Sequence, residues 1–486
     1  MMPSTSFPRS ARILAGPLGA VLLLAACAPV GPNFTPPTPP ADGGYLHKGE
    51  AAAATPASTP QGPQAILGAK TDARWWTAFG SPELNETVEL ALANNPSIEA
   101  ADATLARGRA ELAAVRGTRL PQVDANARVD RQTINFASYG FPGDNPTFTL
   151  YSVGGGVSYD LDLFGGRRRQ VEQTAAQTES RIRQLQAARL SVAGNVVVQS
   201  LIIASLNAEI DLRDRLITDD QRNVDLVTTR QRAGEGTMVE VLNAQSQLAA
   251  DRAELPALRQ QLSAARHMLS ILVGQTPGGW SPPAFDLAKM TLPQQIPVAL
   301  PSELVHKRPD ILEAEADLHA ATAAIGVATA RLYPDITLGA TISQGAPDID
   351  DVLRKSFRGW DLFGGLTAPI FHGGTLKAER HAAVEEARAS GARYRQTLLS
   401  AFGQVADLLT ALSHDQQSVS EEEQASTLAQ KSLHLSRRSF QVGNSGVLQV
   451  LDAQRVYQRA MSGVVEARSR QYLNVARLYV ATAGGW

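Results

Sequence analysis

Hydrophobic side chains recur along this chain at the spacing of very long helices that lie side by side. Between residues 167 and 232, which include no proline, an apolar residue recurs every seven positions: Val196, Ile203, Ile210, Ile217 and Val224. Between residues 375 and 486, also without proline, the steps alternate between four and three and end with one step of seven: Leu398, Phe402, Val405, Leu409, Leu412 and Val419. This is coiled-coil spacing. A helix over residues 167–232 would be about 100 Å long at ~1.5 Å per residue.

Each helical pattern is interrupted once, by short sequences that are similar in the two places. Residues 234–245 read G-E-G-T-M-V-E-V-L-N-A-Q, and residues 443–454 read G-N-S-G-V-L-Q-V-L-D-A-Q. A tight turn needs backbone angles that most residues resist, and glycine supplies them at Gly234, Gly236, Gly443 and Gly446. The sequence therefore predicts two copies of one long helical hairpin, over residues 167–273 and 375–486.

The two hairpins belong to a longer internal duplication. Residues 95–123 align without a gap to residues 308–336, and both copies contain a helical pattern between two prolines. We expect a first structural repeat over residues 81–273 and a second over residues 302–486. A proline-rich connector over residues 274–301 joins them.

Alternating apolar and polar residues separate the proline-bounded helix from the hairpin in each repeat. The alternation is clearest along Tyr151, Val153, Val157, Tyr159, Leu161 and Leu163, and it recurs along Ile336, Leu338, Ala340 and Ile342. It is weaker over residues 123–129 and 366–371. A period of two predicts β-hairpins over residues 123–164 and 336–371. Each strand is about as long as a tilted strand that crosses a bilayer.

Four strands do not suffice for a membrane barrel. A backbone in lipid leaves no sheet edge unpaired, and the smallest closed barrels have about eight strands. Strands placed in a membrane would therefore have to come from several chains. The alternative is a water-soluble four-stranded sheet with one solvated face.

The N-terminus favours the membrane interpretation. Arg9 and Arg12 precede an apolar run over residues 13–26, which is short for a membrane span and has the layout of a signal peptide, assigned here to residues 1–26. The run ends in L-A-A-C, which resembles a bacterial lipobox with Cys27 as the lipidation site. An ordinary signal peptide with an incidental cysteine is the alternative. Ala28 follows the cysteine, and in this resemblance it indicates the outer membrane. Residues 27–80, rich in Pro, Ala and Thr at their start, would form a lipid-anchored tether.

Composition and motifs give no indication of an enzyme. The formal net charge of −2 gives no reason to expect a nucleic acid partner, and one cysteine allows no intrachain disulfide. The eight histidines lack metal-binding spacing, and the glycine run at residues 154–156 lies in a predicted strand and does not open a helix. We therefore expect no catalytic residues, no metal and no cofactor.

Taken together, these features resemble the TolC-like outer-membrane efflux ducts, in particular the lipoprotein branch that serves resistance-nodulation-division (RND) pumps. The resemblance covers nearly the whole mature chain: the lipobox, the duplication, the paired strands, D-L-D-L-F-G at residues 160–165 and the V-L-N/D-A-Q turns. It implies a mainly α fold with a membrane β-barrel. In that fold three chains each give four strands to a twelve-stranded β-barrel and two coiled-coil-like hairpins to a long periplasmic α-helical barrel.

The resemblance also implies a function and partners. The chain would be the outer-membrane exit duct of a tripartite efflux system, passively conducting drugs or other small compounds. Its expected partners are two further copies of the chain, a periplasmic adaptor (membrane fusion) protein, an inner-membrane RND-type pump and outer-membrane lipid. Type I protein secretion uses the same fold and is one alternative. A lipid-anchored coiled-coil scaffold without a channel is another.

The resemblance places the two turns at the periplasmic tip, where the tunnel closes and meets its adaptor. Asp452 matches an aspartate near the tunnel axis, where three copies would form an acidic ring. The simpler alternative is that Asp452 supports the first turn of its helix, although Asn243 occupies that position in the first repeat. Asn243 is counted with Asp452 in the candidate gate, and Gln449 and Glu240, three residues earlier in each turn, complete it. Candidate adaptor contacts, with core packing as the alternative, are the four turn glycines and the apolar residues Met238, Val447 and Leu448.

Two further groups flank the predicted strands. Aromatic residues in the first inter-strand loop suggest an interfacial girdle or an outer mouth: Phe136, Tyr139, Phe141 and Phe148. The run Arg167-Arg168-Arg169 begins a helix just inside the proposed membrane, and we expect these side chains to be solvated or to contact lipid headgroups.

Overall fold

The computed structural model describes residues 29–39, 44–47, 62–69, 71–135, 140, 145–354, 356 and 358–482. The signal peptide, Cys27 and the aromatic residues Phe136, Tyr139 and Phe141 lie outside the described residues. The chain divides into two compact units. The sheet unit contains residues 105–180 and 314–394 with the segment that ends at Pro37, and the hairpin unit contains the remaining described residues.

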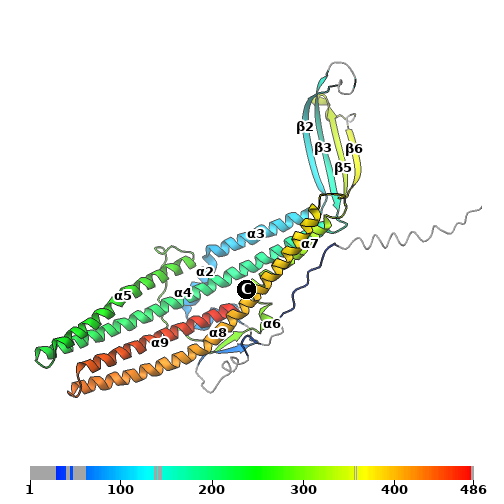
Figure 1. Ribbon diagram of the computed structural model, residues 1–486. Helices are drawn as coiled ribbons and strands as arrows, with labels where there is room; N and C mark the ends of the chain where they lie inside the picture. The colour runs from blue at the N-terminus through cyan, green and yellow to red at the C-terminus, as the bar shows by residue number, and fades with distance from the viewer. Residues whose placement is uncertain are drawn as a thin grey trace, which may run out of the picture. The chain divides into compact units, whose positions relative to one another are not determined.

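Both repeats contain the same order of elements, as the sequence predicted (Figure 1). The first repeat is α3 (Pro96–Gly117), β2 (Gln122–Thr133), β3 (Thr147–Leu161), α4 (Gly166–Arg232) and α5 (Met238–Leu272). The second is α7 (Pro309–Ala330), β5 (Asp335–Ala346), β6 (Arg358–Thr367), α8 (Thr375–Gln441) and α9 (Val447–Thr482). The helices α4 and α8 each have 67 residues, so each is about 100 Å long at ~1.5 Å per residue.

The sheet unit contains one antiparallel sheet with strand order β2-β3-β5-β6. The fourth strand lies earlier than the weak alternation over residues 366–371 predicted, because β6 ends at Thr367. Gly364 and Gly365 interrupt the alternation near its end and hide the strand in the sequence. Pro369, which has no N–H to donate, follows outside the sheet.

The two faces of this sheet differ in polarity. Residues paired across neighbouring strands share a face. Two rows on one face read Val123, Val157, Ala340, Leu362 and Ala125, Gly155, Ile342, Trp360. Two rows on the other face read Asp124, Gly156, Thr341, Asp361 and Gln122, Ser158, Gly339, Phe363. The predicted alternation is therefore present, with one apolar and one mainly polar face.

The hairpin unit is held together by the apolar stripes of its helices. A buried cluster joins the turn-proximal parts of all four long helices: Val224, Val227, Val241, Ala244, Leu248, Leu433, Phe440, Val447, Val450, Leu451 and Ala453. The Arg230 guanidinium lies over the Phe440 ring at 4.3 Å and links α4 to α8. Among the described helices, α4 alone has a segment apolar enough to cross a membrane, and 61% of that segment is buried inside the structure. We therefore assign it to packing within the helical wall.

The segment expected to be a tether is folded in part. Strand β1 (Gln64–Leu67) pairs in parallel with β4 (Gln295–Val298), and the short helix η1 (Trp75–Phe79) is buried. The Trp75 ring stacks on Tyr479 with ring centroids 5.5 Å apart. Helix α2 (Pro82–Asn94) and the single turn α6 (Pro301–Leu304) complete this region. Aromatic and aliphatic side chains late in the expected tether supply the apolar surface that its start lacks.

Candidate functional site

The two inter-helix turns have the same backbone geometry. Gly234 and Gly443 have φ angles of +80° and +79°, a conformation that glycine adopts without a steric penalty. The prediction was wrong for Gly236 and Gly446, which do not have positive φ angles. The residue after Gly234 donates its N–H to the Arg230 carbonyl at 2.9 Å, and the residue after Gly443 donates to the Ser439 carbonyl at 2.9 Å. Such bonds, which close a helix end over five residues, satisfy carbonyls that the helix leaves free. The duplication therefore extends to single hydrogen bonds.

The helices that follow the two turns begin differently. At the start of α5, Thr237 Oγ1 accepts the N–H of Glu240 at 3.3 Å, and Glu240 Oε2 accepts the N–H of Thr237 at 2.8 Å. This reciprocal pair is a capping box. At the start of α9 the equivalent positions hold Gly446, which has no side chain, and Gln449. The Glu240 carboxylate, a candidate for the gate, thus has a local role in holding α5.

Asp452 is the most exposed acidic group of the candidate gate. Its side chain is 75% exposed, and its Oδ1 lies 3.5 Å from Arg455 Nη1. Arg455 also donates from Nε to Gln247 Oε1 at 3.0 Å, across the two hairpins. An exposed ion pair of this length contributes little to stability. Asn243, its counterpart on α5, is half-buried.

The structure separates the candidate adaptor contacts into exposed and buried residues. Met238 and Leu448 are 56% and 53% exposed. Val447, named with them, is 3% exposed and belongs to the core cluster between the hairpins, so its side chain packs and is not a contact. Val239 and Leu242, which sequence reasoning did not name, are 64% and 56% exposed on the first turns of α5.

A buried polar network joins the two hairpins, and the sequence analysis did not identify it. Asp220 on α4 accepts from Gln454 Nε2 at 2.8 Å and from Gln458 Nε2 at 3.1 and 3.2 Å, both on α9. Gln458 Nε2 also lies 3.4 Å from Asp251 Oδ2 on α5. Gln454 Oε1 in turn accepts from Arg437 on α8 at 2.8 Å. The duplicated Ala-Gln dipeptide contains Gln454 and was the one available signal.

Burial changes the acidity of this network. Asp220 and Asp251 are both buried, and Asp251 lies 3.4 Å from Arg213 Nη1. Loss of solvent, with smaller contributions from the hydrogen bond and charge of Asp251, raises the pKa of Asp220 to about 7. The two glutamine amides oppose this change because they donate to the carboxylate.

A second cluster of charged residues lies in the sheet unit, where strand β3 ends and helix α4 begins. Arg169, expected to be solvated, is buried on the first turn of α4. Its guanidinium donates to the carbonyls of Val30 and Gly31 at 3.1 and 3.2 Å and to Asn33 Oδ1 at 2.7 Å. Its Nη1 lies 2.7 Å from Glu172 Oε2. Arg169 therefore holds the chain segment at residues 30–33 against the helix.

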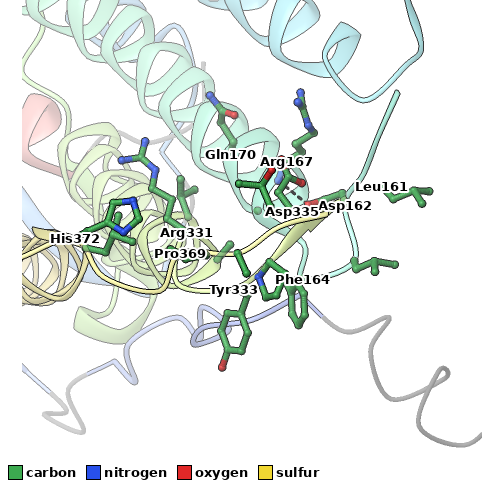
Figure 2. A pocket seen from close by; sticks show the side chains of 18 residues that line it. Leu161, Asp162, Phe164, Arg167, Gln170, Arg331, Tyr333, Asp335, Pro369 and His372 are labelled. Atoms are coloured by element: carbon green, nitrogen blue, oxygen red, sulfur yellow. Dashed lines mark hydrogen bonds between the residues drawn. The ribbon is translucent and has the colours of Figure 1, made fainter. Parts of the chain in front are cut away.

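A cavity of about 550 Å³ lies where β3, β5 and β6 meet their helices. Figure 2 shows Arg167 beside Asp162, whose Oδ1 accepts the Arg167 N–H at 2.9 Å. Phe164 and Tyr333 stack on one another in its wall, 4.6 Å between ring centroids. Charged and aromatic groups thus share one lining. Across the part of the chain described above, no three His, Cys, Asp or Glu side chains are grouped to hold a metal.

Comparison with known proteins identifies the class. The sequence profile of the outer membrane efflux protein family matches residues 87–275 and 300–484, which together include both hairpins, both turns and all four strands. The chain belongs to the outer membrane efflux protein family. It is 30% identical over 418 residues to the pyoverdine export outer membrane protein OpmQ of Pseudomonas aeruginosa, covering 85% of this chain and 87% of that protein.

Two further likenesses extend this membership. The chain is 25% identical over 471 residues to the probable outer membrane lipoprotein SilC of Salmonella typhimurium, with 96% and 98% of the two chains covered. The solved outer-membrane channel OprN superposes with a TM-score of 0.83 at 26% identity, covering 94% of this chain and 99% of that one. These findings confirm the predicted TolC-like fold and the prediction of an outer-membrane efflux channel. The family is one of channel proteins.

Proposed function

We propose that three copies of this efflux channel form the exit duct of a tripartite efflux system. Each chain gives four strands to a twelve-stranded β-barrel and two hairpins to a periplasmic tunnel. An RND-type pump in the inner membrane and a periplasmic adaptor deliver drugs or other small compounds to the tunnel, which conducts them passively. Lipidation of Cys27 adds an anchor in the outer membrane, and several acyl chains hold far more firmly than one.

The open sheet is the observation that carries this proposal. Its edge strands β2 and β6 each have one side without a partner among the described strands. All neighbouring strands are antiparallel, so β6 of one chain would also run antiparallel to β2 of the next. On the apolar face, Trp360, Leu362 and Leu366 of β6 are 78%, 73% and 67% exposed. Pairing of these edges between chains would leave no edge in lipid and would turn the apolar face outward.

We assign the gate and the adaptor contact to the two turns. Three exposed Asp452 carboxylates around one axis would attract cations and resist each other's approach. Exposed apolar residues at the same end of the hairpins, Met238, Leu242 and Leu448, supply surface that an adaptor would cover. The buried Asp220 network ties α9 to α4 and α5 within each chain, and opening of the tip would have to strain it.

The native mass of the detergent-extracted, full-length protein tests the proposal. We expect three chains, each of 51.8 kDa less its signal peptide, and a small conductance in a planar bilayer when the tip is closed. A stable monomer without conductance would overturn the shared barrel, because four strands cannot close. A trimer that never conducts would leave the scaffold interpretation in its place.

A further inference from the structure

Strand β6 places one large apolar side chain on the polar face of the sheet. The residues of β6 on this face are Gly359, Asp361, Phe363, Gly365 and Thr367. Phe363 is the one large apolar side chain among them, and its row continues through Gly339, Ser158 and Gln122. In the proposed barrel this face lines the water-filled lumen. Contact with lipid therefore does not explain why an aromatic ring lies on this face.

The glycine beside this ring explains how it is accommodated. A Cβ atom placed on Gly339 would lie 2.2 Å from Phe363 Cζ and 2.5 Å from Cε1, far inside contact distance. The ring of Phe363 therefore rests over the backbone of Gly339 on the neighbouring strand β5. Gly339 does not have a positive φ angle, so its backbone does not require glycine. It is the ring of Phe363 that requires glycine at this position. Aromatic side chains in other sheets cover a glycine of a neighbouring strand in the same way.

The position of the ring matters for the size of the lumen. Twelve strands ~4.8 Å apart and tilted by ~40° give a backbone cylinder of radius about 12 Å. A ring lying flat on the wall occupies ~4 Å of that radius, since atoms in contact are 3.5–4.0 Å apart. A ring displaced from the wall occupies more, and three such rings would lie at one level. The flat position leaves the ring 44% exposed.

We propose that Gly339 and Phe363 together set the free width of the duct near the periplasmic end of its barrel. Gly339 leaves room for the Phe363 ring to lie against the barrel wall. Any side chain at position 339 would displace the ring toward the barrel axis. This inference rests on the proposed trimeric barrel. It identifies two residues that limit the size of the solutes that pass through the duct.

Cysteine reporters on β6 can measure this width in whole cells. Gly365 lies on the same face, one step nearer the helices than Phe363, and Gly359 lies two steps in the opposite direction. A Cβ at Gly365 or Gly359 meets no atom closer than 4.0 and 3.8 Å, so Gly365→Cys and Gly359→Cys fit without strain. A maleimide on a polymer too large for porins can reach position 365 only through the barrel. The chain without a reporter gives the background of Cys27, the single natural cysteine.

We expect Gly339→Val to slow polymer labelling at position 365 at least threefold, while a small maleimide labels at the normal rate. Labelling at position 359 should not change. Adding Phe363→Ala to Gly339→Val should restore the polymer rate. Gly345→Val is the matched control, because Gly345 shares the strand and face and its Cβ would meet nothing within 3.7 Å. Gly339→Ala repeats the test with a smaller side chain if valine prevents assembly.

Three results would overturn the assignment. Unchanged polymer labelling at position 365 in an assembled Gly339→Val trimer would show that the ring does not limit the lumen. Slow labelling that persists without Phe363 would assign the obstruction to another group. A Phe363→Ala chain that is monomeric would make the ring a contact between chains. Failure of the duct itself is distinct, because position 359 would then remain unlabelled in the otherwise unchanged chain.

Discussion

The buried carboxyl of Asp220 makes the stability of the hairpin unit depend on pH. Burial raises the pKa of Asp220 from its ordinary 3.8 to about 7. Between these values the folded chain keeps a proton that the unfolded chain has released, so the contribution of Asp220 to stability is greatest below pH 4 and falls as pH rises to about 7. At 1.4 kcal/mol per pH unit the whole interval corresponds to on the order of 4 kcal/mol. Between pH 5 and pH 8 the contribution of Asp220 should fall by on the order of 2 kcal/mol per chain, which makes opening easier at the higher pH.

Hydrogen exchange of the detergent-extracted protein measures this opening directly. The relevant amides lie on α4 around Asp220 and on α9 around Gln458, whose side chain donates to both Asp220 oxygens. Protection factors, corrected for the intrinsic dependence of exchange on pH, should fall between pH 5 and 8. In Asp220→Asn the side chain cannot ionise, so most of this dependence should disappear and protection at pH 8 should exceed that of the natural chain.

The neighbouring aspartate provides the control. Asp219 has a partly exposed side chain and pairs with Arg222 at 2.9 Å, so Asp219→Asn removes a carboxylate from the same turn without removing a buried one. The hydrogen-exchange protection of Asp219→Asn should depend on pH as that of the natural chain does. Equal pH dependence in Asp220→Asn and the natural chain would refute the reasoning, since the buried carboxyl would then have the same protonation state at pH 5 and at pH 8.

Three other changes have expected outcomes. Asp452→Ala removes the exposed charge at the tip and should raise single-channel conductance or antibiotic leakage, whereas unchanged conductance in an assembled trimer would make Asp452 structural. Thr237→Ala removes the hydroxyl that caps α5 and should destabilise the first turn by about 1 kcal/mol, measurable as faster exchange at Glu240 than in the natural chain. Leu362→Arg places a charge on the apolar face at a cost of ~2–4 kcal/mol near the bilayer centre, so it should reduce insertion. Asp361→Arg, one residue away on the polar face, should insert normally, and equal insertion of both variants would argue against the assigned faces.

Local patterns predicted most of the fold because helices and hairpins are specified by nearby residues. The heptad stripes and the glycine turns gave α4, α5, α8 and α9. Strong alternation gave β3 and β5, while the paired glycines at 364 and 365 displaced β6 in the prediction. The capping box of Thr237 and Glu240 is also a local rule and could have been read from T-x-x-E.

The sequence did not predict which residues of other helices contact the site residues. Asp220 and Gln458 are 238 positions apart, and neither lies in a recognisable motif. Their contact depends on which faces of α4 and α9 meet. The same uncertainty applies to Val447, whose side chain could equally have faced solvent until the neighbouring hairpin covered it. Apolar content alone does not distinguish a contact surface from a core.

Duplication gave the two turns the same backbone, and later divergence gave them different chemistry. In the first turn the acidic residue caps the helix, since Glu240 accepts the N–H of Thr237. The second turn has Gly446 at the capping position and keeps its acid, Asp452, exposed one turn further along the helix. A helix start without a side-chain cap is less firmly held. In the proposed gate, the hairpin that presents the charge is therefore also the one whose returning helix begins without a side-chain cap.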